Sequence, residues 1–232
     1  MASSRPPAAI DALRQLLGPA HLLTGGLALL SASSSKKPRP RLLLATDAFA
    51  LAEPEAQGAL REASAMLGAT DEIEISGGRS AVFLEAYTTL QGLDVMRALG
   101  VFLGSGPSFG ATIAPRFEGA RALDSAVDPL WRALRKEMAV RMHALLSSGT
   151  MLLLPTTPSI APLRFLRDAH AERFYQAALT LSSVAGLAGL PVVTLPIAVL
   201  NGCPLGLSVL AGPGEDEALL AAATSDLTTF PT

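Results

Sequence analysis

The sequence predicts an α/β protein in which a mixed β-sheet is flanked by helices. Residues 41–75 have the order strand, helix, strand, which is typical of a parallel βαβ unit. Residues 192–211 have the order strand, Asn-Gly turn, strand, which is typical of an antiparallel hairpin. With 232 residues, half of them hydrophobic, the chain is long enough to bury a core of substantial size.

Two regions are expected. Residues 1–40 hold a helix over 10–30, where leucines recur at helical spacing, followed by a polar linker that is rich in serine, proline and positive charge. Residues 41–232 hold the α/β domain. The N-terminus lacks the continuous apolar segment of a secretory signal, although import into an organelle stays open as an alternative.

The domain begins with a buried strand over 41–46 and a turn at Asp47. An amphipathic helix over 54–67 and a short strand over 72–75 follow, and they complete the βαβ unit. A long, mostly apolar helix then runs over 82–102 until a Gly-Ser-Gly-Pro sequence ends it.

The loop Ser76-Gly77-Gly78-Arg79-Ser80 has two interpretations. Glycine-rich loops before helices can hold phosphate, but the Lys-Ser or Lys-Thr ending of a phosphate-binding loop is missing. Ordinary capping of the following helix is therefore favoured.

The second half contains the clearest amphipathic helix, over residues 130–146, with apolar side chains on one face. A strand over 150–154 follows it, and a helix over 168–185 starts with Asp168 as its predicted N-cap. His143 lies among core-facing positions of the amphipathic helix. A partly buried histidine with satisfied hydrogen bonds is favoured there over a catalytic base.

Residues 174–214 contain no charged side chain, so this stretch lies either in a packed interior or in a membrane. The interior is favoured because Pro191 and Pro196 each remove a backbone donor and several glycines weaken any continuous helix. A membrane anchor over residues 181–199 is the less favoured alternative.

Composition excludes several functions. A net charge of −2 and a pI near 5.9 give no electrostatic case for binding nucleic acid or an anionic membrane. Cys203 is the only cysteine, so neither a disulfide framework nor a thiolate metal cluster is available, and no metal or cofactor is expected. Its thiol is interpreted as a bystander rather than a nucleophile. The compartment expected from this is the cytoplasm.

Three segments carry a resemblance to a known family. MLLLPTTPSIAP at residues 151–162 and PSFGATIAPRF at 107–117 resemble connections in the amidase signature family. Residues 186–220 resemble the C-terminal part of that family, with its Gly-Leu-Pro, a strand ending in proline, Pro-x-Gly-Leu, and a helix that opens with acidic residues. The similarity is nearest to the plant-type members that resemble indole-acetamide hydrolases. Only the C-terminal half of the family's fold is covered.

The resemblance implies a serine hydrolase of linear carbon–nitrogen amide bonds. Its members use a serine nucleophile, a second serine in a cis peptide and a buried, deprotonated lysine. This chain has no Gly/Ser-rich loop of that type, and its lysines are Lys36 and Lys37 in the polar linker and Lys136 between two charged neighbours. We therefore expect no catalytic residue here and a chain that is inactive alone. It would be a truncated gene product, a fragment from an incomplete gene model, or one piece of a split enzyme that needs its other half to bind an amide.

Thr156 and Thr157 are the predicted substrate-binding residues. They follow the strand over 150–154, and ligand sites in α/β sheets form beyond the C-terminal ends of strands. In the family this loop lies near the substrate pocket. A tight turn bounded by prolines is the competing interpretation.

The competing function is a non-catalytic interaction module, in which the half-sheet docks onto a partner. A half-sheet also exposes an edge strand, which predicts self-association.

Overall fold

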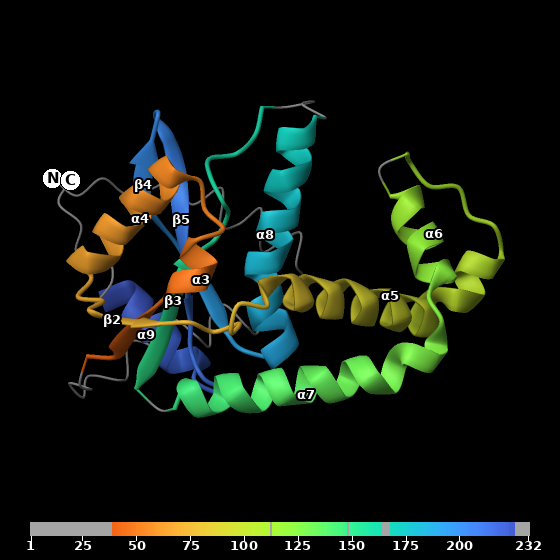
Figure 1. Cartoon of the computed structure of the whole chain (residues 1–232), viewed down its shortest axis with the longest axis horizontal. Coiled ribbons are helices and arrows are strands. Elements are labelled where there is room, and N and C mark those ends of the chain that lie inside the picture. Colours follow the sequence, from red (N-terminus) through yellow and green to blue (C-terminus); the bar gives the residue numbers. More distant parts are fainter. Residues whose placement is uncertain (1–38, 112, 148, 164–167, 226–232) are drawn as a thin grey trace, which may run out of the picture. The chain divides into compact units, whose positions relative to one another are not determined.

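Five strands of the part of the chain that the structure describes form one sheet in the order β2-β1-β3-β5-β4 (Figure 1). The structure is a computed structural model that describes residues 39–111, 113–147, 149–163 and 168–225. The predicted helix over 10–30 and nearly all of the polar linker lie outside these residues. The strands are β1 (Arg41–Ala45), β2 (Asp71–Ile73), β3 (Thr150–Pro155), β4 (Val192–Leu200) and β5 (Cys203–Leu210).

The helices connect these strands and cover both faces of the sheet. They are α3 (Thr46–Phe49), α4 (Pro54–Met66), α5 (Ser80–Gly104), α6 (Ala114–Ala122), α7 (Asp128–Leu145), α8 (Ala169–Ala188) and α9 (Asp216–Ser225), with a 3-10 turn at Ser125–Val127.

The sheet is mixed, as the sequence predicts. Strand β1 is parallel to β2 and to β3, while β5 is antiparallel to both β3 and β4. The parallel pair β1–β2 comes from the βαβ unit, the parallel pair β1–β3 joins this unit to a strand that follows α7, and the antiparallel pair β4–β5 comes from the hairpin. Asn201 and Gly202 both have positive φ, 53° and 75°, which is what a two-residue primed hairpin turn requires.

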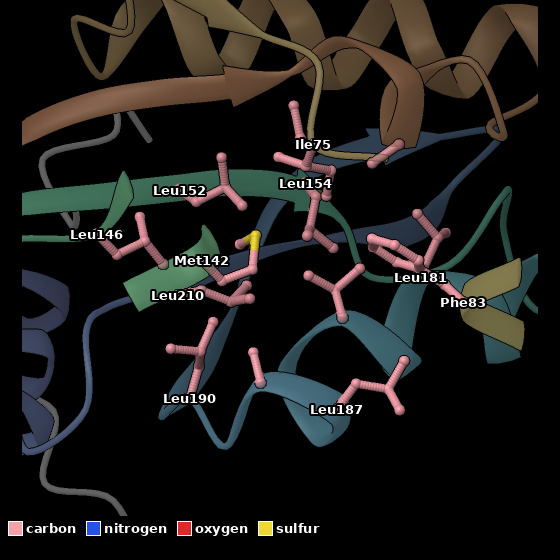
Figure 2. Close-up of a cluster of buried hydrophobic side chains, with 14 of the residues drawn as sticks. Ile75, Phe83, Met142, Leu146, Leu152, Leu154, Leu181, Leu187, Leu190 and Leu210 are labelled. Carbon is pink, nitrogen blue, oxygen red and sulfur yellow. The ribbon is translucent and has the colours of Figure 1, made fainter. Parts of the chain in front are cut away.

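Strand β3 separates two hydrophobic layers because successive side chains point to opposite faces. Leu152 and Leu154 belong to a core with α5, α7 and α8, where Figure 2 shows side chains from these elements converging. Met151 and Leu153 belong to a second core with α3, α4 and α9. A strand buried on both faces needs the continuous apolar run that β3 has.

Several boundaries differ from the prediction for physical reasons. Strand β2 ends at Ile73 rather than at residue 75, because the backbone N–H groups of Ile75 and Ser76 donate to the carboxylate of Asp47, at 3.1 and 2.7 Å. Asp47 itself lies in the short helix α3 rather than in a turn. Strand β4 ends at Leu200, directly before the Asn-Gly turn.

The capping prediction is wrong for one helix and confirmed for another. No side chain caps the start of α5, whose N-cap is Arg79. The carboxylate of Asp168 accepts the backbone N–H of Ala171 at 2.9 Å, so Asp168 caps α8 as expected.

The charge-free stretch folds into the interior and the sheet. Residues 181–199 are divided between the end of α8 and β4, so the predicted anchor is not a helix of its own. Within the described residues, every helix is too short or too polar to cross a membrane.

Candidate functional site

The predicted site lies at the C-terminal end of β3, where this strand runs beside β5. The backbone N–H of Thr156 donates to the carbonyl of Gly206 at 2.9 Å and extends the β3–β5 pairing by one residue. Thr156 is partly buried, directly beyond the buried Pro155. Its position is therefore fixed by the sheet rather than by the loop that follows.

The hydroxyl of Thr156 is paired with that of Ser208, whose side chain is nearly buried on β5. The two oxygens, Thr156 Oγ1 and Ser208 Oγ, are 2.8 Å apart. Two hydroxyls carry two hydrogens and their mutual bond uses one of them. The pair therefore keeps one donor and several lone pairs for another group, and it carries no charge.

Gly206 makes this pairing possible. A β-carbon at Gly206 would lie 2.9 Å from Thr156 Oγ1 and 2.9 Å from Thr194 Cγ2, closer than a β-carbon comes to an atom to which it is not bonded. Only glycine lets both threonines lie against β5 at this point. The requirement explains the glycine of the Pro-x-Gly-Leu sequence at residues 204–207.

Thr157 has a different environment from Thr156. Its hydroxyl donates to the backbone carbonyl of Ser159 at 2.8 Å, inside the Pro-bounded turn. This contact is the one expected of a turn residue. The two predicted residues are thus adjacent in the chain, but one faces β5 and the other closes the loop.

Ser208 and Gly206 are not among the site residues that the sequence predicts. Gly206 belongs to the Pro-x-Gly-Leu sequence that resembles the family. Ser208 follows it by two residues, so both side-chain positions lie on the same face of β5. A serine inside an otherwise apolar strand was the available signal. Its partner Thr156, however, is 52 residues away, and no local pattern reveals that pairing.

The groups that could act as a base lie elsewhere. Lys136, the one lysine among the described residues, is exposed on α7. His143 Nε2 is 2.7 Å from the carbonyl oxygen of Ala188, so its hydrogen bond is satisfied as predicted, although the residue is exposed rather than core-facing. Within the described part of the chain, no three His, Cys, Asp or Glu residues are grouped to hold a metal ion.

A cavity of about 180 Å³ lies between the start of α5 and α7. Its walls combine apolar side chains with Ser76, Arg79 and Arg141. Thr156 is not among the lining residues, so the cavity is separate from the end of β3.

Comparison with models of known protein families gives no match. Among curated proteins, Amidase 1 of Arabidopsis thaliana is 32% identical over 116 residues, which is 50% of this chain and 27% of the relative. Amidase 1 of Oryza sativa subsp. japonica is 36% identical over 90 residues, which is 39% of this chain and 21% of the relative. The matched part of the chain thus spans about a quarter of the length of these two relatives.

Solved structures with the same fold cover more of the chain. An amidase superimposes with a TM-score of 0.67 at 24% identity, covering 80% of this chain and 45% of its own. A bacterial aryl acylamidase that belongs to the amidase signature enzymes has a TM-score of 0.63 at 11% identity, covering 88% and 49%. In both cases about half of the solved chain has no counterpart here.

Proposed function

Since the chain is related, over part of its length, to the amidase signature enzymes, we propose that it forms one half of a hydrolase of small-molecule amides. It supplies half of the sheet and one wall of the substrate pocket. The nucleophile and the base come from another polypeptide segment, which makes the chain inactive alone. The proposal applies both to a truncated product and to one piece of a split enzyme, because in either case this chain lacks the nucleophile and the base.

Amide hydrolysis requires a nucleophile, a base that accepts its proton, and donors for the developing oxyanion. A lysine can act as the base only where burial lowers its pKa. Lys136 is exposed to solvent on α7, and Lys36 and Lys37 stand in a stretch of serines, arginines and prolines. The exposure of Lys136 is the observation that carries the proposal, because it leaves the described residues without a desolvated amine.

The role proposed for Thr156 and Ser208 is to bind the amide. A carboxamide offers one strong acceptor and N–H donors, and the hydroxyl pair offers one donor and free lone pairs. The 2.8 Å bond between the two hydroxyls can reverse its direction, so the pair can present either hydroxyl hydrogen to the substrate. Thr157 would act by holding the turn, through its bond to Ser159.

The test is complementation. The chain is co-expressed with the part of Arabidopsis Amidase 1 that carries the family's lysine and Gly/Ser-rich loop, and ammonia release from aryl and indole acetamides is measured. We expect steady turnover only when both polypeptides are present. Thr156→Val keeps the shape of the side chain and removes its hydroxyl. It should raise KM about fivefold to tenfold, because the loss of one hydrogen bond to the substrate weakens binding by about this factor.

Thr88→Val is the matched control, because the Thr88 hydroxyl is exposed on α5 and bonds only within its own helix. It should leave KM unchanged. Steady turnover by the purified chain alone would contradict the inactivity proposed here. Stable association of the two polypeptides without any turnover would contradict the function itself.

The proposed compartment is the cytoplasm, with organelle import as the alternative. It is supported by the single, half-buried cysteine, Cys203, since a protein built for an oxidising compartment commonly uses disulfides. Fractionation of cells that express the tagged chain would decide between the two.

A further inference from the structure

The two edges of the sheet differ in the way they meet solvent. At one edge, β2 has only three residues, and two of them, Asp71 and Glu72, form ion pairs with Arg41 and Arg61. Short, charged edge strands are protected against pairing with another chain. At the other edge, β4 has nine residues and lies in a segment without charge from Phe174 to Gly214. No strand of the described residues pairs with its outer side.

The pairing of β5 shows which backbone groups of β4 face outward. The carbonyl of Gly206 accepts from Thr156, so the backbone groups of Gly206 point toward β3. These groups alternate in direction along an antiparallel strand, so those of Leu207 point toward β4. Leu207 is paired with Leu195, whose backbone groups must point back toward β5.

The same alternation then assigns the outer edge. The backbone groups of Val193 and Leu195 face β5. Those of Val192, Thr194 and Pro196 alternate with them along the strand and therefore face away from β5. The bond from the Ala211 N–H to the Pro191 carbonyl, 3.2 Å, has the direction that this pattern requires. The edge therefore offers N–H donors at two residues and carbonyl acceptors at three, because proline has no N–H.

We propose that two copies of the chain pair through this edge, with antiparallel β4 strands related by a twofold axis at Thr194. Each Thr194 then exchanges N–H and carbonyl bonds with Thr194 of the second copy. Each Val192 N–H donates to the Pro196 carbonyl of the second copy, so the missing proline donor removes only one bond at each end. The two sheets become one continuous sheet.

Side chains support the same register. Val192 is 50% exposed, and Thr194 and Pro196 are exposed on the same face of the sheet. Pairing about Thr194 places one threonine opposite the other, a favourable cross-strand pair, and places Val192 beside Pro196. No like charges meet, because the segment has none. The irregular register between Pro196 and Ala198 limits the pairing to this short stretch.

The test measures the oligomeric state of the full chain by sedimentation velocity over a wide range of concentration. We expect the wild-type chain to pass from monomer to dimer as its concentration rises. Thr194→Pro removes the central N–H donor, which points outward and is not used within the monomer, so proline is tolerated there. This variant should stay monomeric while its circular dichroism spectrum matches that of the wild type.

Thr194→Val is the matched control, since it keeps the backbone donor and the Cγ2 atom that lies near Gly206. It should dimerise like the wild type. Thr194→Lys is a second variant in case the proline disturbs folding, because it sets like charges opposite each other and should also prevent pairing. A wild-type chain that is monomeric at every concentration would overturn the proposal. So would a folded Thr194→Pro chain that still dimerises. Both measurements use the chain without the second polypeptide, so their outcomes are distinct from the outcome of the complementation test of amide hydrolysis.

Discussion

At Gly206, a missing side chain decides the geometry of the candidate site. A methyl group there would press against the Thr156 hydroxyl and the Thr194 methyl, and neither neighbour is a freely moving chain end. We expect Gly206→Ala to lower the free energy of unfolding by about 1–3 kcal/mol, the usual cost of overpacking. Urea denaturation of the variant and the wild type measures the difference.

Gly58→Ala is the control for that measurement. Gly58 lies in α4, and a β-carbon added to it would meet no atom within 4 Å. Alanine should stabilise the helix there by about 0.5–1 kcal/mol. Equal effects of the two substitutions would show that the close approach at Gly206 is not real.

Asp47, in α3, links this helix to the loop that follows β2. Burial raises the pKa of its carboxyl, but hydrogen bonds from Ser76 and from the backbone of Ile75 outweigh burial and hold the pKa below its ordinary value. A carboxyl with a lowered folded-state pKa contributes stability that is complete above its unfolded pKa of about 3.9. That stability is lost as the pH falls through the folded-state pKa.

We therefore expect the free energy of unfolding to decrease as the pH falls from about 5 to about 3. Asp47→Asn should be less stable than the wild type at about pH 6 and should lose less on acidification. Urea denaturation at several pH values measures both slopes. Asp94 and Asp168, whose carboxyls also have lowered pKa values, contribute to both proteins equally, so the difference between the slopes isolates Asp47. Parallel slopes would contradict the role given to Asp47.

At the scale of the element, β3 carries both cores. Leu153 is fully buried in the layer with α4 and α9, and its neighbour Leu152 is fully buried in the other layer. Leu153→Ala should lower the free energy of unfolding by about 2–5 kcal/mol, because it removes buried methyl groups and leaves a cavity.

Leu130→Ala is the matched substitution on α7. Leu130 is 68% exposed, so its truncation should change the free energy of unfolding by less than about 0.5 kcal/mol. Chemical denaturation of both variants gives the comparison. A small loss for Leu153→Ala would mean that the sheet is not covered on the α4 side.

The sequence predicts elements that carry a strong local pattern. The Asn-Gly turn, the proline at the start of α4 and the Asp168 cap are local, and each is found as expected. Helix α6 escapes prediction, because its nine residues are polar on average and lack a regular apolar face. Helical spacing puts Leu130 on the apolar face of α7, yet it is exposed, because periodicity does not tell where a helix leaves the core.

The site shows the same division between local and distant information. The position of Thr156 at the end of β3 follows from the strand pattern before it. Its bond to Ser208 depends on β5 lying between β3 and β4, an order that no segment of the sequence states. The uncapped start of α5 is a similar case, because the loop before it is held by Asp47 from another element.

For the whole molecule, the sheet lies between two hydrophobic layers and is packed against both of them. Trp131, the single tryptophan, packs at the border of the layer with α5, α7 and α8. If the two layers unfold together, tryptophan fluorescence and far-ultraviolet circular dichroism should report the same urea midpoint. We expect coincident transitions at low protein concentration, because β3 is central to both layers. A fluorescence transition at a lower urea concentration would mean that the layer with α5, α7 and α8 unfolds first.

The strand order has a consequence for how the chain is made. Strand β3 leaves the ribosome before β5, so one side of it stays unpaired until residues 203–210 have been translated. The nascent protein then carries an open, apolar strand, the kind of surface on which chaperones act. Closure needs little further search, because β4 and β5 are joined by a two-residue turn and form a hairpin within microseconds. Translation must therefore pass residue 210 before β3 can be paired on both of its sides.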